Sequence, residues 1–259
     1  MWKVILGILV PFVGTTLGAM CVCLLRKGLG DKTSKALNGF AAGVMVAASI
    51  WSLIMPAIDA SFKMGRFAFF PAALGFMIGI LFLLMLDKLE PHLVTNNNCK
   101  EVNKSKIKRT TKLVLAVTIH NIPEGMAVGA LFAACLSENM HIAFMTSLTL
   151  ALGIAIQNIP EGAIISMPLH SEGKSKAKSF FIGVLSGVVE PIAALITLSI
   201  SHIIETLLPY VLSFAAGTMI YVVVEELIPE FKEGNHSKVG VISFALGFVV
   251  MMILDVMLG

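Results

Sequence analysis

Eight apolar stretches, each about as long as a bilayer is thick, constrain this 259-residue chain more than any other feature. The hydrocarbon core of a membrane is about 30 Å thick, and a helix needs about 20 apolar residues to cross it. Only 14% of the residues are charged, whereas about a quarter are charged in an ordinary soluble domain. The sequence therefore predicts an all-α polytopic membrane protein with a single transmembrane domain over residues 1–259. Its spans are expected near 4–25, 38–57, 67–87, 113–135, 142–168, 179–203, 207–229 and 239–258.

Basic residues are distributed unevenly over the connections between these spans. The connections after the first, third, fifth and seventh spans hold 16 of the 19 Lys and Arg residues. The other side holds only Lys3, Lys63 and Arg66. Because cytoplasmic loops collect positive charge, we expect a cell-membrane protein with both termini facing outward. The long polar connection over 88–112 is then a cytoplasmic loop, expected to be flexible because nothing in it could pack a core.

Two short words recur in the same order along the chain. FAAGVM at 40–45 resembles FAAGTM at 214–219, and ALGF occurs at 73–76 and again at 245–248. Each separation corresponds to five spans, which reverses the direction of travel through the membrane. Spans 1–3 and 6–8 are therefore predicted to be inverted repeats around spans 4 and 5, although glycine-rich membrane helices can share such words by chance. A 3+2+3 arrangement of this kind is typical of secondary transporters, whose site lies near the midplane.

The fourth and fifth spans share a polar motif, HNIPEG at 120–125 and QNIPEG at 157–162. In each motif the first residue and the Glu four positions later lie on one face of a helix, and the Asn lies about 100° further round. The proline removes one backbone hydrogen bond, and the glycine permits close approach of another helix. Because the two spans run antiparallel, the motifs can face each other. The donors so placed are His120, Asn121, Glu124, Gln157, Asn158 and Glu161.

Carboxylates inside the spans are the costliest feature of the sequence. A charge at mid-bilayer costs about 2.5–3.5 kcal/mol on insertion scales, and a bound cation would neutralise several such charges at once. Taken alone, the histidine could simply bridge two helices, and the last two acids could be a solvated pair at a helix end. Imidazole, amide and carboxylate groups together favour a metal site. The acids within spans are Glu124, Glu161, Glu190, Glu225 and Glu226.

With paired NIPEG motifs between two three-span repeats, the chain resembles the Zrt/Irt-like protein (ZIP) family of divalent-metal transporters, and most of all its prokaryotic GufA-like subgroup. The resemblance implies a binuclear metal centre. Its first metal would be bound by His120, Glu124, Gln157 and Glu161, with Met45 as an additional ligand. Its second would be bound by Asn121, Asn158 and Glu190, with the two motif glutamates as bridges. Glu225 and Glu226 match positions that line the route toward the cytoplasm.

Two positions depart from the family pattern. Many members have His where this chain has Gln157 and an acid where it has Asn158, so the site carries less negative charge here. The expected function is uptake of a divalent transition metal as cargo, Zn²⁺ first and Cd²⁺, Fe²⁺ or Mn²⁺ next. The expected partners are metal ions and the lipid bilayer, with a homodimer as a candidate assembly, no resident cofactor and no nucleic acid. The alternatives are a passive divalent-cation channel and a membrane-embedded metalloenzyme, which the absence of HExxH disfavours.

Overall fold

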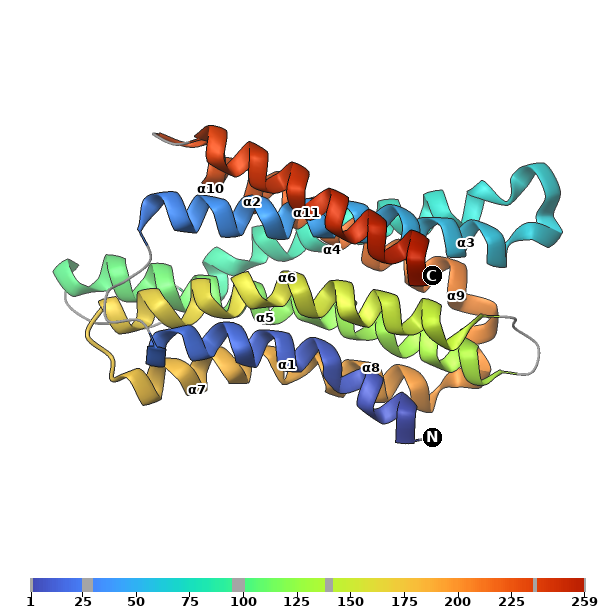
Figure 1. Cartoon of the computed structure of the whole chain (residues 1–259), viewed down its shortest axis with the longest axis horizontal. Coiled ribbons are helices and arrows are strands. Elements are labelled where there is room, and N and C mark those ends of the chain that lie inside the picture. The colour runs from blue at the N-terminus through green and yellow to red at the C-terminus, as the bar shows by residue number, and fades with distance from the viewer. Residues whose placement is uncertain (1, 25–29, 95–100, 138–141, 235–236, 259) are drawn as a thin grey trace.

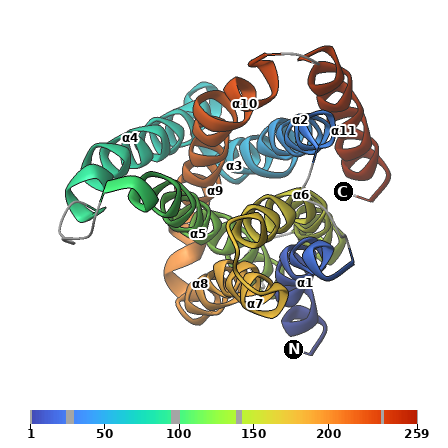
Figure 2. The same cartoon turned by 90° about the vertical axis from the view of Figure 1, so that its left-hand side faces the viewer.

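The protein is a bundle of helices, seen from two sides in Figures 1 and 2. The computed structural model describes residues 2–24, 30–94, 101–137, 142–234 and 237–258, and every regular element in those residues is helical. Eight stretches in this part of the chain are long and apolar enough to cross a membrane, which confirms the predicted all-α fold with eight spans. They are Trp2–Leu24, Asp31–Ala60, Phe69–Lys88, Val117–Leu136, Phe144–Ser171, Lys176–Ser199, Thr206–Lys232 and Lys238–Leu258.

Several spans contain more than one helical element. The first three spans comprise α1 (Trp2–Leu24), α2 (Asp31–Ala48), η1 (Ser49–Ile54), α3 (Met55–Ala60), η2 (Phe62–Phe67) and α4 (Phe69–Val94). The central pair is α5 (Glu101–Leu136) and α6 (Phe144–Ser171). The last three spans comprise α7 (Lys176–Gly187), α8 (Val189–Ser199), α9 (Ser201–Val222), η3 (Val223–Leu227), α10 (Ile228–Lys232) and α11 (Ser237–Leu258).

The polar connection between the third and fourth spans differs from the prediction. A loop was expected over 88–112, but α4 continues to Val94 and α5 already begins at Glu101. Lys, Arg, Glu and Leu are good helix formers even on a polar segment, so each helix can extend beyond its apolar part into water. Residues 95–100 of the expected loop lie outside the described residues. The apolar part of the third span ends at Lys88 and that of the fourth begins at Val117, both near the predicted points.

The spans pack as two groups, which Figure 2 shows one above the other. In the lower group α1 packs along α6 and α5 packs along α8, with α7 against α1. In the upper group α2 packs along α11 and α9 along α4. The groups meet where α6 contacts α2 and where α5 contacts α9. The two motif helices, α5 and α6, therefore lie on the seam between the groups.

The helix pairs can be compared with those that the predicted repeat would relate. An inverted repeat would relate spans 1, 2 and 3 to spans 6, 7 and 8, and span 4 to span 5. It would then relate the packed pair α1–α6 to the pair α8–α5, and the pair α2–α11 to the pair α9–α4. All four pairs are in contact. The second and seventh spans also contain π-helical segments at corresponding places, Ser49–Ile54 and Val223–Leu227. Such turns are rare and often occur at functional sites. The inverted-repeat symmetry itself stays a prediction.

The two ends of the bundle differ in charge. The start of α1 and the end of α11 lie at the same end of the bundle, on the right in Figure 1. The opposite end carries the starts of α2 and α7 and the end of α10, and with them Lys35, Lys176 and Lys232. Below, this is called the basic end.

Candidate metal centre

The backbone of the motif helices is more regular than their prolines suggest. Pro123 lies inside the continuous helix α5 and Pro160 inside α6, and both side chains are buried. The sixth span, in contrast to the two motif helices, is interrupted midway along its length. Its first helix, α7, ends at Gly187, and α8 begins at Val189, directly before Glu190. The motifs therefore present their polar groups from intact helices, toward an acid that follows a break.

The glycine of each motif sets the distance to a neighbouring helix. A Cβ added at Gly125 would lie 2.3 Å from the backbone oxygen of Glu190 in α8. A Cβ added at Gly162 would lie 2.2 Å from the backbone oxygen of Thr15 in α1. No side chain tolerates such distances, so glycine at these positions permits the close approach of the backbones. Each motif is thus held against one outer helix of its own group.

Glu190 accepts three hydrogen bonds from side chains and is only 1% exposed. Its Oε1 accepts hydrogen bonds from Thr15 Oγ1 at 3.0 Å and Asn121 Nδ2 at 2.9 Å. Its Oε2 accepts one from Asn158 Nδ2 at 2.9 Å. The structure therefore brings together the three residues predicted for the second metal, with one asparagine from each motif.

Thr15 is the member of this group that the sequence did not single out. A hydroxyl in an apolar span carries no charge and can bond to the backbone of its own helix. A threonine in such a span therefore gives no sequence signal for a binding site. The available signal was the repeat, since Thr15 and Glu190 are separated by 175 residues, close to the offset of the repeated words. Thr15 is completely buried, and its hydroxyl satisfies the carboxylate directly.

Two residues predicted for the first metal are also in direct contact. Gln157 Nε2 donates a hydrogen bond to Glu124 Oε1 at 2.6 Å, across the interface between α6 and α5. Glu124 is 2% exposed and Gln157 is fully buried. The partly buried Glu161 is close enough to Glu124 and to Glu190 for like-charge repulsion with both carboxylates.

The remaining predicted residues lie at different distances from this cluster. His120 is buried, and its Nε2 lies 3.5 Å from Glu226 Oε1, so the centre connects directly to the seventh span. The neighbouring Glu225 is exposed. Met45 is 1% exposed and packs in the apolar core. Its role as a ligand stays a prediction.

Four oxygen atoms of the centre are buried and accept no hydrogen bond, although nearly all buried polar atoms in proteins have a partner. They are Asn121 Oδ1, Glu124 Oε2, Gln157 Oε1 and Asn158 Oδ1. The side chains that hydrogen bond to Glu124 and Glu190 are all neutral amides or hydroxyls. In the described part of the chain, no group of three His, Cys, Asp or Glu side chains could hold a metal by itself. A cation bound here would therefore need the amide oxygens as ligands.

Comparison with known proteins agrees with these features. The family model described as ZIP Zinc transporter matches residues 104–255. The chain is 37% identical to zinc transporter ZIP11 of Xenopus tropicalis, over 98% of this chain and 97% of that protein. It is 36% identical to zinc transporter ZIPB of Bordetella bronchiseptica, over 98% and 81%. It is 34% identical to zinc transporter GufA of Myxococcus xanthus, over 95% and 94%. The chain therefore belongs to the ZIP zinc transporter family.

Proposed function

We propose that this chain carries a divalent transition metal, Zn²⁺ first, across the cell membrane into the cytoplasm through the buried centre on α5, α6 and α8. Relatives that match it over nearly its whole length are named zinc transporters, which favours transport over catalysis. The observation that carries the site is the set of unpartnered oxygens around Glu124 and Glu190. A buried carboxylate is costly unless it is paired. A divalent ion would supply both the missing charge and the missing partners.

The first metal is proposed to use His120, Glu124, Gln157 and Glu161, with Met45 as the additional ligand. The contact between Glu124 and Gln157 supports this set, because it leaves one oxygen of each side chain without a partner at the same place. The imidazole would bind in its neutral form, so uptake should fall as the pH is lowered and protons compete with the metal. Amide oxygens bind less tightly than charged groups, which suits a carrier that must also release its cargo.

The second metal is proposed to use Asn121, Asn158 and Glu190, with Glu124 and Glu161 as bridges. The two asparagines already meet at Glu190, and the carbonyl oxygen of each is free to act as a ligand. The three hydrogen bonds to Glu190 partly satisfy its charge without a metal. We therefore expect the second metal to bind more weakly than the first.

The direction of transport is proposed from the ends of the bundle. Placing the basic end in the cytoplasm puts both termini outside. Glu226, next to His120, would be the first group that the metal meets on its way inward, and Glu225 would line the same route. Large apolar side chains that are exposed, such as Leu185, Val256 and Met257, would contact lipid. A homodimer stays a candidate assembly.

Uptake by liposomes tests this function. The purified chain is reconstituted with an entrapped zinc indicator, and initial rates are measured for the wild type and for Glu124→Ala, His120→Ala and Glu172→Gln. Glu172 is an exposed acid near the basic end and serves as the control. Loss of Glu124 should lower uptake by more than about 100-fold, because removing a ligand should cost more than the loss of about 10–100-fold seen when a partner of a ligand is removed. Unchanged uptake in both centre variants would contradict the assignment.

The same assay separates a carrier from a channel. A carrier must pass through a bound state, so its rate should saturate as the zinc concentration rises. A channel would give a nearly linear flux that responds to the membrane potential. Repeating the assay with Cd²⁺, Fe²⁺ and Mn²⁺ would rank the cargo, because imidazole, amide and carboxylate ligands can bind each of these ions.

A further inference from the structure

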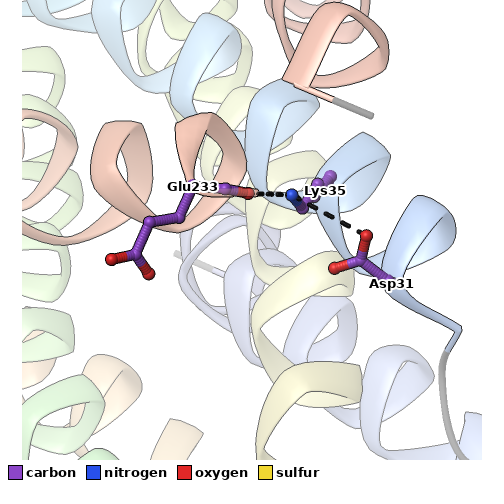
Figure 3. Close-up of polar contacts among 3 residues, drawn as sticks. All are labelled: Asp31, Lys35 and Glu233. Atoms are coloured by element: carbon purple, nitrogen blue, oxygen red, sulfur yellow. Dashed lines mark hydrogen bonds and ion pairs between the residues drawn. The ribbon is translucent and has the colours of Figure 1, made fainter. Parts of the chain in front are cut away.

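A buried lysine lies at the basic end of the second span. The Lys35 side chain is 6% exposed, and its Nζ lies 3.7 Å from Asp31 Oδ2. The same ammonium donates a hydrogen bond to the backbone oxygen of Glu233, where α10 ends (Figure 3). Gly234, at φ 68°, turns the chain directly after that carbonyl. Lysine usually keeps its charged group in water, so an ammonium anchored in this way is unusual.

One helical turn further along α2, Asn38 presents an unpartnered oxygen beside a carboxylate. Asn38 is 1% exposed, and its Nδ2 donates a hydrogen bond to Glu230 Oε2 in α10. Its Oδ1 is buried and accepts no hydrogen bond. Because both atoms belong to one amide group, the free oxygen stays close to the same carboxylate. Lys35 and Asn38 are three residues apart and so lie on the same face of α2.

This pair lies on the proposed path of the metal. Glu230 follows Glu226 by four residues toward the basic end of the seventh span, and Glu226 contacts His120. The second span packs against both η3 and α10, which carry these two acids. The side chain of Glu233 points away from Lys35, so that residue contributes its backbone rather than its charge (Figure 3).

We propose that Asn38 and Glu230 form a further divalent-cation site at the basic end, and that the anchored ammonium of Lys35 keeps this site weak. An amide oxygen and a carboxylate are suitable ligands for such ions. A fixed positive charge nearby raises the free energy of a bound cation without removing any ligand. Because Asp31 and Glu233 hold Lys35 in place, its charge cannot move away when a metal arrives. The site would thus receive metal from Glu226 and release it quickly, a role that rests on the proposed function.

Zinc binding to the purified full-length chain tests the site directly. The background carries Glu124→Ala and Glu190→Ala, which remove the main carboxylates of the centre, and binding is followed by equilibrium dialysis against Zn²⁺. Residual binding should weaken at least about tenfold in Asn38→Leu and in Glu230→Gln, each of which removes a ligand. Lys35→Gln should tighten it about tenfold, the size expected for one unit charge near a divalent ion whose carboxylate ligand, Glu230, is exposed to solvent. Asn38→Asp should also tighten it.

Two controls match these variants. Lys232→Gln removes an exposed cation at the same end of α10, and Glu172→Gln removes an exposed acid near the same end. Both should leave residual binding unchanged because solvent screens exposed charges. The gains expected for Lys35→Gln and Asn38→Asp cannot come from misfolding, which would only lose binding. Absence of residual binding, or residual binding that Asn38→Leu, Glu230→Gln and Lys35→Gln all leave unchanged, would overturn the proposal.

The two proposals fail in distinguishable ways. If Glu124→Ala abolishes uptake by liposomes but no residual zinc site responds to Asn38 or Lys35, the transport function stands and the site at the basic end is wrong. If the residual site responds as expected while Glu124→Ala transports normally, the basic-end site stands as a cation site and the proposed route is wrong.

Discussion

The two motif helices of the centre are alike in backbone but differ in the first residue of the motif and in the neighbouring helix that each contacts. Both run through a buried proline, and both place a glycine against the backbone of a neighbouring helix. The neighbour of the first motif carries the acid Glu190, whereas the neighbour of the second carries the hydroxyl of Thr15. His120 in the first motif corresponds to Gln157 in the second. The two motif helices thus have similar backbones, but the charged and polar groups around them differ.

The same contrast separates the two π-helical segments. In η1 the two central residues are Trp51 and Ser52, and Ser52 donates a hydrogen bond to Asp255 at 2.7 Å. In η3 the corresponding residues are Glu225 and Glu226, and Glu226 contacts His120. Of these two segments, η1 contains no acid, whereas η3 adds two carboxylates beside the centre. On the proposed route, these unequal side chains distinguish the two directions of transport.

Neutralising the two motif glutamates in turn should give the largest effect. Glu124 is almost fully buried and hydrogen-bonded to Gln157, while Glu161 is partly exposed. We expect Glu124→Gln to lower zinc uptake by more than about 100-fold and Glu161→Gln by about tenfold, because an exposed ligand is more readily replaced by water. Initial rates in liposomes measure both variants. Equal losses would mean that the halves of the centre are equivalent in function.

Exchange of the imidazole and the amide between the motifs should have the next largest effect. His120→Gln is expected to raise the KM for zinc about tenfold, since it removes the strongest neutral ligand. Gln157→His should lower both KM and the maximal rate, because the metal would be held more tightly. The double variant His120→Gln/Gln157→His restores the ligand set but not its position beside Glu226. It should therefore remain impaired, and full recovery would show that only composition matters.

Much of this molecule could be predicted from the sequence, because membrane and helix geometry impose strict periods. The eight apolar lengths give the spans, and the i to i+4 spacing places His120 with Glu124 and Gln157 with Glu161. The contacts among the three second-site residues agree with the grouping that the resemblance implied.

The rest depends on how helices approach one another, which no local period encodes. The hydrogen bonds of Thr15 to Glu190, of Lys35 to Glu233 and of Asn38 to Glu230 all join spans far apart in the chain. The helices extend into 88–112 although this segment has no apolar face, because a polar segment of good helix formers can continue a helix into water. Lys35 was counted only as one of the charges that orient the protein, although its neighbours hold it inside.

Adding a methyl group to either motif glycine tests whether the two motif helices pack equally closely against their neighbours. The added Cβ would lie 2.3 Å from a backbone oxygen at Gly125 and 2.2 Å at Gly162. Because backbone cannot move aside, Gly125→Ala and Gly162→Ala should each cost about 1–3 kcal/mol in the free energy of unfolding. Thermal unfolding in detergent should show similar decreases in Tm. Gly30→Ala is the control, since its added Cβ would meet nothing within 4 Å. A large decrease in only one variant would show that the two helices pack unequally.

Removing the hydroxyl of Thr15 should give the smallest effect, and it tests how the neighbour of the second motif contributes to Glu190. Thr15→Val keeps the shape of the side chain but removes one of three hydrogen bonds to Glu190. The two asparagines remain, so the cost should be about 1 kcal/mol, the usual net value of a hydrogen bond. Oε1 of Glu190 would then accept one hydrogen bond, from Asn121, in place of two, and would be more available to a metal. Zinc should therefore raise the Tm of Thr15→Val more than that of the wild type, whereas a purely structural hydroxyl predicts equal increases.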